Sequence, residues 1–254
     1  QNIGAYGAEV AELIASVRAW DRLRNRVVWL ALGELGLAYR DSRLKQSLTD
    51  AEVGGGRLWG PTGRWVVLDA TFAVRQGSLS SRVAYSQLAG ALGVELGERV
   101  PERELREAVL KLRRSKGMVL DGVDHDTWSA GSFFTNPILT EDQAVSLPED
   151  APRFPVTDHS QVVLGTKEAP VIEGLVKTSA AWLIDHAGFT KGFTVEPGAS
   201  AGLSTKHVLA LTNRGGATGA DLARLRDEVV AGVCERYGVT LTPEPVQVGF
   251  QDLS

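Results

Sequence analysis

The chain has 254 residues, with 27 basic and 31 acidic side chains and a formal net charge of −4. Apolar residues make up 43% of the sequence and charged residues 23%, proportions that exclude a disordered tail or a fibrous repeat. The isoelectric point near 5.7 argues against a nucleic-acid partner and a polybasic membrane-binding surface. No apolar run reaches the roughly 18 residues that span a bilayer, and the length predicts one large domain or two smaller ones.

Two residue types are scarce enough to be informative. The single cysteine, Cys234, can form neither an internal disulfide nor a cysteine metal site, which favours a reducing compartment. The only methionine is Met118, so Gln1 is not an initiator residue, and we expect an upstream segment to have been removed or omitted.

The first 100 residues are typical of short strands joined by turns. Residues 26–30 (RVVWL) and 63–74 (GRWVVLDATFAV) are rich in β-branched and aromatic side chains, which favour strands. Three successive glycines at 54–56 predict a loop between them, because glycine adopts turn conformations at low cost. From Pro101 the spacing becomes helical, and four apolar side chains share one face: Leu105, Ala108, Val109 and Leu112.

The second half alternates helices and strands. Thr140 and Gln143 form a capping-box pattern before a short helix that stops near Pro148. A second helix is predicted from Ser179 (SAAWLIDHAG), closed by Gly188.

The last 50 residues contain the strongest helical pattern. HVLALTN (207–213) predicts a strand, and Thr218 then caps a long helix that ends at Gly238. The apolar face of that helix consists of Leu222, Leu225, Val229, Val233 and Tyr237. Residues 239–250 are expected to be extended, and the seam between the two halves is expected near 115–128. Together the elements predict an α+β fold in two parts.

Two polar loops allow a functional interpretation beside a structural one. An acidic loop resembles a site for a hard metal ion, although it lacks EF-hand spacing, so a solvated polar turn is favoured and no metal is expected; its members are Asp121, Asp124, His125 and Asp126. NRGGATGAD (213–221) hints at a phosphate loop but lacks the GxxxxGK[ST] arrangement, which favours a glycine turn followed by a helix cap.

The segment GSFFTNP (131–137) is the third candidate. It predicts a buried turn with Phe133 and Phe134 in the core. Ser132 within it has no obvious histidine base in the sequence, which counts against a hydrolase triad. Read residue by residue, these motifs fix no activity.

The order of the motifs is more specific. QNIGAYGAEV, YRDSRLK, RRSKGMVLD, GSFFTNP, KTSAAWLID, STKHVLALTNRGGAT and LTPEP follow one another along essentially all 254 residues. In this order they closely resemble the UDP-N-acetylenolpyruvoylglucosamine reductase (MurB) family, flavoenzymes that make UDP-N-acetylmuramate for peptidoglycan.

The resemblance implies a domain organisation. Residues 1–116 match the C-terminal part of an FAD-binding (PCMH-type) α+β domain, and 117–243 match an α/β substrate-binding domain. Residues 244–254 match a strand that returns to the active site. The family has a glycine-containing, pyrophosphate-binding part upstream of QNIGAYG with no counterpart here, so we expect the chain alone not to retain FAD tightly.

The resemblance also implies a mechanism with FAD and NADPH as cofactors. NADPH reduces FAD, the flavin passes hydride to the enolpyruvyl group of a UDP-sugar, and the neighbouring carbon receives a proton. Ser132 matches the family's proton donor, with a structural turn serine as the alternative.

Two further catalytic residues follow from the match. Arg40 matches the arginine that binds the substrate carboxylate, the alternative being a surface ion pair with Asp41. Glu244 matches the glutamate near the family's C-terminus that helps to polarise the substrate carboxylate or assists protonation, although Pro245 replaces an apolar residue beside it. We expect Arg40, Ser132 and Glu244 to line one cleft.

The remaining matched positions concern binding. Those matching contacts to the substrate or the nicotinamide are Tyr85, Lys116, Asn136 and His207, where Tyr85 could instead be a strand-edge aromatic and His207 a structural histidine. Those matching contacts to the flavin or a cofactor phosphate are Ile3, Gly4 and Arg113.

The resemblance therefore predicts a cytoplasmic, NADPH-dependent flavin oxidoreductase of cell-wall synthesis, with no nucleic-acid or membrane partner. The first rival is a non-catalytic nucleotide-sugar-binding fragment unable to hold FAD. The second is another flavoprotein of the same FAD-binding superfamily, against which the GSFFTNP motif argues.

Overall fold

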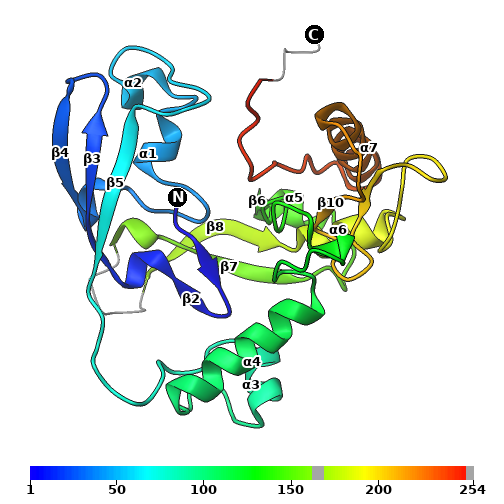
Figure 1. Ribbon diagram of the computed structural model, residues 1–254, viewed down its shortest axis with the longest axis horizontal. Coiled ribbons are helices and arrows are strands. Elements are labelled where there is room, and N and C mark those ends of the chain that lie inside the picture. Colours follow the sequence, from blue (N-terminus) through cyan, green and yellow to red (C-terminus); the bar gives the residue numbers. More distant parts are fainter. Residues whose placement is uncertain (162–168, 250–254) are drawn as a thin grey trace. The chain divides into compact units, whose positions relative to one another are not determined.

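The computed structural model describes residues 1–161 and 169–249 and combines helices with antiparallel strand pairs, as the α+β prediction requires (Figure 1). The chain divides into two compact units. Unit 1 contains Gln1–Leu105 with the described parts of Thr157–Ile172 and Val246–Ser254, and unit 2 contains Arg106–Val156 and Glu173–Pro245. The domain boundaries after residues 116 and 243 stay predictions.

Unit 1 is built on a three-stranded antiparallel sheet in the order β4-β3-β5. Its strands are β3 (Ile14–Asp21), β4 (Arg26–Ala31) and β5 (Trp65–Phe72), which confirms both strands predicted in this region. A tight two-residue pair, β1 (Gly4–Ala5) and β2 (Ala8–Glu9), precedes the sheet. One face of the sheet packs on a core of Ala11, Ile14, Val17, Ala19, Leu30, Leu35, Leu37 and Trp65.

Short helices in unit 1 begin at side-chain caps. Ser42 caps α1 (Arg43–Gln46) and Asp50 caps α2 (Ala51–Gly54), which lies in the predicted glycine loop. Gly55 ends α2 with a φ of 78°, a conformation that glycine adopts without strain. Three other short helical segments lie in the first 100 residues: η1 (Val10–Glu12), η2 (Leu32–Glu34) and α3 (Ser86–Leu92).

A buried ion pair stabilises the sheet of unit 1. The side chains of Asp21 and Arg64 are 1% and 7% exposed, and Arg64 donates from Nε and Nη2 to the two carboxylate oxygens at 3.0 and 2.8 Å. Burial raises the pKa of Asp21, but the bonds from Arg64 and from the amides of Leu23 and Arg24 outweigh it and lower the pKa below its usual range.

Strand β5 has little cover. Its residues from Val66 to Leu68 are about half exposed, as is Phe72. Because neighbouring side chains of a strand point to opposite faces, apolar surface is exposed on both sides of β5. In the part of the chain that the structure describes, β5 pairs only with β3 and is an edge strand.

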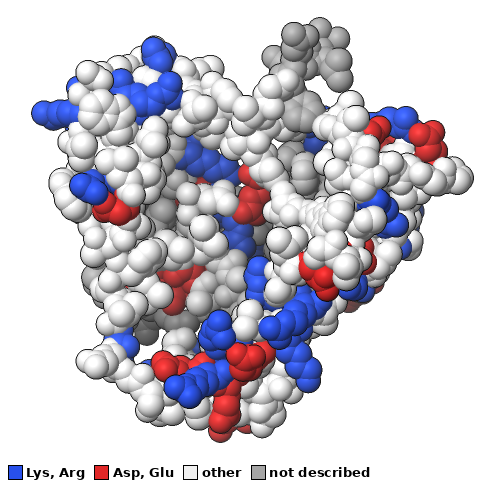
Figure 2. Space-filling view, in the orientation of Figure 1, with Lys and Arg blue, Asp and Glu red and all other residues white. Residues whose placement is uncertain are grey.

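Helix α4 (Glu102–Ser115) confirms the helix predicted after Pro101. It begins in unit 1 and continues into unit 2, and none of its residues is fully buried. Figure 2 shows acidic and basic side chains crowded together over α4, at the bottom of the view. The predicted apolar stripe is therefore only partly covered.

Unit 2 packs two small sheets against helices. One sheet has the order β6-β8-β7, and the other pairs β9 with β10. The strands are β6 (Ile138–Thr140), β7 (Arg153–Thr157), β8 (Val171–Thr178), β9 (Ala201–Leu203) and β10 (Leu211–Asn213). The helices are η3 (His125–Thr127), α5 (Glu141–Val145), α6 (Ala180–His186) and α7 (Gly219–Tyr237); η4 (His159–Gln161) belongs to unit 1.

The predicted helices of unit 2 are confirmed at their caps. Thr140 and Ser179 cap α5 and α6, and Thr218 caps α7. Gly238 closes α7 in the left-handed conformation, as predicted, while Ala187 rather than Gly188 is the C-cap of α6. The largest fully buried side chains of this core are Phe134, Leu183, Ile184, Leu203, Leu225, Val229, Val233 and Leu241.

The strand predicted for residues 207–213 was wrong over its first four residues. Only Leu211–Asn213 forms a strand, β10. The preceding residues form a turn, because the Ser204 hydroxyl accepts bonds from the amides of Lys206 and His207 and the Ala210 amide bonds to the His207 carbonyl. At the other end of unit 2, Pro243 pairs with Phe134 through an isolated bridge, and Phe250 lies outside the described residues.

Candidate active site

The turn at residues 131–137 positions Ser132 in unit 2. The Phe133 amide donates to the Leu209 carbonyl at 2.8 Å, and the Thr135 amide donates to the Thr242 carbonyl at 3.0 Å. Phe134 is 2% exposed, so its ring anchors the turn in the core, as predicted. Ser132 thus directly precedes a segment whose backbone is fixed by two contacts.

The structure supplies the histidine that the sequence did not reveal. The Ser132 Oγ lies 3.4 Å from Nε2 of His207, which comes from the turn after Ser204, 75 residues later in the chain. Both residues were predicted separately, Ser132 as proton donor and His207 as a substrate contact. Their pairing depends on tertiary structure, so spacing alone gave no signal for it.

Charge and burial keep the His207 imidazole neutral. Burial is the largest cause, and the ammonium groups of Lys116 and Lys191 add to it, lowering the pKa of His207 from 6.5 to about 4. Burial also lowers the pKa of Lys116. In a hydrolase triad a carboxylate faces the histidine, whereas the charged neighbours that perturb His207 are two lysines. This arrangement suits His207 to hydrogen bonding as a neutral imidazole rather than to accepting a proton.

Two more predicted residues are placed by the same turn. The Glu244 amide donates to the Phe133 carbonyl at 2.8 Å, which brings its backbone beside the residue that follows Ser132. The Asn136 Oδ1 accepts from the Ala180 amide at 3.0 Å, at the start of α6. Asn136 therefore joins the turn to a helix.

Arg113 has a visible structural role. Its Nη2 donates to the Met118 carbonyl at 3.0 Å, closing the chain after α4. The predicted contact between Arg113 and a cofactor phosphate stays a prediction.

In unit 1, the predicted residues Arg40 and Gly4 lie together. The Arg40 backbone has a φ of 54°, and its guanidinium donates to the carbonyls of Gly4 at 2.6 Å and Asn2 at 3.3 Å. A Cβ at Gly4 would lie 2.8 Å from Glu9 Cγ, so a larger residue here would displace the Glu9 side chain. Ile3, which lies between Asn2 and Gly4 in the sequence, is 63% exposed. Arg40 thus anchors the segment predicted to contact the flavin.

Tyr85 lies at the start of α3 in the same unit. Its ring meets that of Tyr6 edge-on, with the centroids 5.7 Å apart, and 37% of Tyr85 is exposed. Whether it contacts substrate stays a prediction, as does the convergence of Arg40, Ser132 and Glu244.

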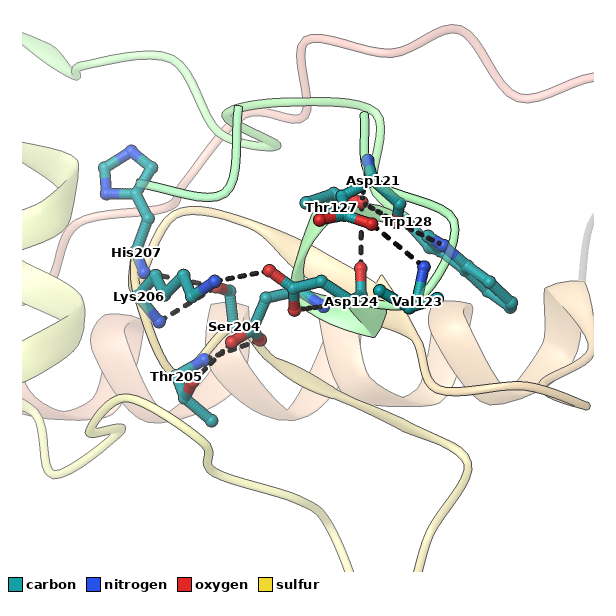
Figure 3. Close-up of polar contacts among 10 residues, drawn as sticks. Asp121, Val123, Asp124, Thr127, Trp128, Ser204, Thr205, Lys206 and His207 are labelled. Atoms are coloured by element: carbon teal, nitrogen blue, oxygen red, sulfur yellow. Dashed lines mark hydrogen bonds and ion pairs between the residues drawn. The ribbon is translucent and has the colours of Figure 1, made fainter. Parts of the chain in front are cut away.

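The acidic loop favours the structural interpretation. No group of metal-binding side chains is found within residues 1–161 and 169–249. Asp124 pairs with Lys206, as Figure 3 shows, and Asp126 bonds to Thr205, so both aspartates contact the turn that carries His207. The glycine loop is likewise a capped turn, because Asn213 Oδ1 accepts from the amides of Gly215 and Ala217.

No helix in the described parts of the chain is long and apolar enough to cross a membrane.

A sequence model of the C-terminal domain of UDP-N-acetylenolpyruvoylglucosamine reductase matches residues 123–248. Reductases of that name from Cutibacterium acnes and Streptomyces coelicolor are each 49% identical over 98% of this chain. The one from Thermobifida fusca is 47% identical, again over 98%.

The chain spans 58–64% of the length of these three relatives. The crystal structure of the reductase from Thermus caldophilus is 19% identical with a TM-score of 0.46, and the match covers 96% of this chain and 56% of that one. The relatives match nearly the whole sequence, and the family model covers the half that contains the turn with Ser132. The chain belongs to the UDP-N-acetylenolpyruvoylglucosamine reductase family.

Proposed function

We propose that the protein carrying this chain reduces the enolpyruvyl ether of UDP-N-acetylglucosamine enolpyruvate with NADPH and FAD, giving UDP-N-acetylmuramate for peptidoglycan. The observation that carries the proposal is the Ser132 hydroxyl at 3.4 Å from the imidazole of His207, whose pKa is lowered to about 4 partly by Lys116. All three residues were predicted from the family resemblance alone. A cytoplasmic location stays a prediction.

The residues of unit 1 fit a flavin. Gly4 and Gly7 present backbone without a side chain, Ile3 offers an exposed apolar side chain, and the Arg40 guanidinium lies at the Gly4 carbonyl. Ile3 and Gly4 would contact the ring system. When bound, FAD supplies the hydride that adds to the enolpyruvyl β-carbon.

Ser132 completes the reduction. Hydride addition leaves an electron pair on the substrate α-carbon, delocalised into the carboxylate, and that carbon takes the hydroxyl proton of Ser132. The O–H bond breaks, a C–H bond forms, and negative charge moves to the serine oxygen. An alkoxide is unfavourable in isolation, so neighbouring groups have to stabilise it.

His207 and Lys116 are suited to this stabilisation. A neutral imidazole protonated at Nε2 donates to the serine oxygen, and the charged Lys116 ammonium favours negative charge nearby. A protonated imidazole would also donate, but burial beside two lysines makes that form costly. The site is thus suited to stabilise negative charge on the Ser132 oxygen without a formal base.

The roles proposed for Arg40 and Glu244 concern the substrate carboxylate. A guanidinium matches a carboxylate with two parallel bonds, which suits Arg40 to the enolate-like charge. Glu244, next to a substrate carboxylate, would be protonated or paired with a cation to avoid repulsion. Arg40→Lys is therefore expected to slow reduction of the substrate more than it weakens binding.

The test is Ser132→Ala in a complete reductase carrying this sequence. We expect the reduction of FAD by NADPH to be retained and the reoxidation of FAD by substrate to be lost, because only the second half-reaction needs the proton. Stopped-flow flavin absorbance measures both half-reactions. Ser146→Ala, which removes an exposed hydroxyl at the end of α5, is the matched control. Equal loss of both half-reactions in Ser132→Ala would make this serine structural.

A further inference from the structure

We propose that the acidic loop Asp121–Trp128 is a positioning device that holds Lys116 and His207 in place around Ser132, with Asp124 and Asp126 as its working residues. Both aspartates act through other residues and touch no reacting atom. The proposal assigns a role to a loop that the reaction does not otherwise use. The catalytic part of this role rests on the proposed function.

One side of the loop binds the turn that carries His207. Asp126 Oδ1 accepts from the Thr205 amide at 2.9 Å, and its Oδ2 accepts from the Thr205 hydroxyl. Asp124 forms an ion pair with Lys206. Figure 3 shows Asp124 directed at Lys206, the residue immediately before His207. These contacts span 79 and 82 residues of sequence, so they fix the turn by tertiary structure.

The other side of the loop meets the residue after Lys116. Gly117 has a φ of 68°, and a Cβ there would lie 2.8 Å from the Asp126 carbonyl oxygen. No side chain fits between these two backbones. Asp126 therefore contacts the chain next to Lys116 through its backbone and the chain near His207 through its carboxylate.

The loop is rigid enough to transmit position. Asp124 accepts from the Asp126 amide at 3.0 Å, and the Thr127 hydroxyl donates to the Asp121 carbonyl at 2.9 Å. The Trp128 carbonyl accepts from the Asn213 amide at 3.0 Å, which ties the loop to β10. The loop is thus braced internally and fixed to the sheet of the same unit.

The direction in which the His207 pKa changes distinguishes a positioning role of the two aspartates from a direct effect of their charge. The charged groups that perturb His207 are Lys116 and Lys191, and burial is the largest cause of its low pKa. Removing a carboxylate charge by itself would lower the imidazole pKa further, because a nearby anion favours the charged imidazolium. Loosening the turn would admit water and raise the pKa. The two roles therefore predict opposite shifts.

The experiment follows the four histidines of the 254-residue chain by NMR as pH changes, with His207 assigned by substitution. Asp124→Asn and Asp126→Asn are each expected to raise the His207 pKa by about one unit, as hydration of a buried group does. Lys206→Met breaks the same ion pair from the other side. Asp121→Asn is the matched control, because its carboxylate bonds within the loop, to the Val123 amide at 3.1 Å.

A rise in the pKa with Asp124→Asn and Asp126→Asn, absent in Asp121→Asn, would support the positioning role. An unchanged or lowered pKa in both would overturn it. In a complete reductase, Asp126→Asn is also expected to slow flavin reoxidation by substrate while leaving reduction by NADPH intact. If Ser132→Ala left turnover unchanged, the proposed function would fail, whereas the histidine titration would still decide the positioning role.

Discussion

The two units place their predicted functional residues in different ways. In unit 2, Ser132 and His207 contact each other, Lys116 perturbs the His207 pKa, and the Glu244 backbone bonds to the same turn. In unit 1, Arg40 binds the backbone carbonyls of the segment around Gly4. The difference fits the proposed function, in which unit 2 orders side chains for proton transfer and unit 1 offers a backbone surface for binding.

The same contrast holds for stability. Among the described residues, unit 2 buries eighteen side chains in one apolar cluster, whereas unit 1 buries eight and relies on the ion pair of Asp21 and Arg64. We therefore expect the stability of unit 1 to be sensitive to the removal of a buried charge and that of unit 2 to the loss of apolar volume.

The largest effect is expected from Asp21→Asn in unit 1. It leaves the Arg64 guanidinium buried without its anion, which costs about 3–5 kcal/mol in comparable proteins. Asp69→Asn is the matched control in the same sheet, where the pair with Arg18 is 43% exposed at each partner, and should cost less than about 1 kcal/mol. Urea unfolding measures both, and equal costs would show that burial of the first pair is unimportant.

Unit 2 should respond most to a cavity. Leu225 in α7 is fully buried, and Leu225→Ala is expected to cost about 2–5 kcal/mol in the free energy of unfolding. Leu68→Ala in β5, where the side chain is 48% exposed, should cost roughly 1 kcal/mol or less. If both substitutions cost the same, β5 is covered in solution and the contrast between the units is smaller than proposed.

A smaller effect is expected from pH. The His207 pKa is about 4 in the folded chain and about 6.5 when unfolded, so between these values the unfolded state binds more protons. Stability is therefore present in full above pH 6.5 and is lost as pH falls toward 4, by about 2 kcal/mol after allowing for solvent screening.

His207→Gln removes this pH dependence if the assignment is right. Urea unfolding at pH 7 and at pH 4.5 compares the variant with the wild type. His186→Gln, in the same unit but stacked on Trp182, serves as control and should keep the wild-type slope. A slope that persists in His207→Gln would place the titration on another group.

Local features of the sequence were sufficient for most helices and for two strands. Thr218 and Gly238 bound α7 because capping and left-handed glycine are local effects that tertiary packing reinforced. The stretch from His207 to Ala210 has strand-like composition, but the Ser204 hydroxyl and the contacts of Asp126 hold it as a turn. The strand propensity of these residues was therefore outweighed by hydrogen bonds to other parts of the chain.

The candidate site divides in the same way. The resemblance predicted Ser132, His207 and Lys116 as site residues. The contact between Ser132 and His207, and the effect of Lys116 on the His207 pKa, are seen only in the folded chain. Arg40 was expected to bind a substrate carboxylate, and in the structure its guanidinium also supports the Gly4 backbone, which no pattern in the sequence indicates. The acidic loop was favoured as a solvated turn, yet its carboxylates bond to the turn before His207.

Strand β5 has a consequence for the behaviour of the chain in solution. Its free edge and its exposed Val66, Val67 and Leu68 offer both backbone hydrogen bonds and apolar contact to another strand. Concentration and salts such as sulfate strengthen that kind of association. Association through β5 would lower the colloidal stability of the 254-residue chain, and Val67→Lys would oppose it by charge without touching the core.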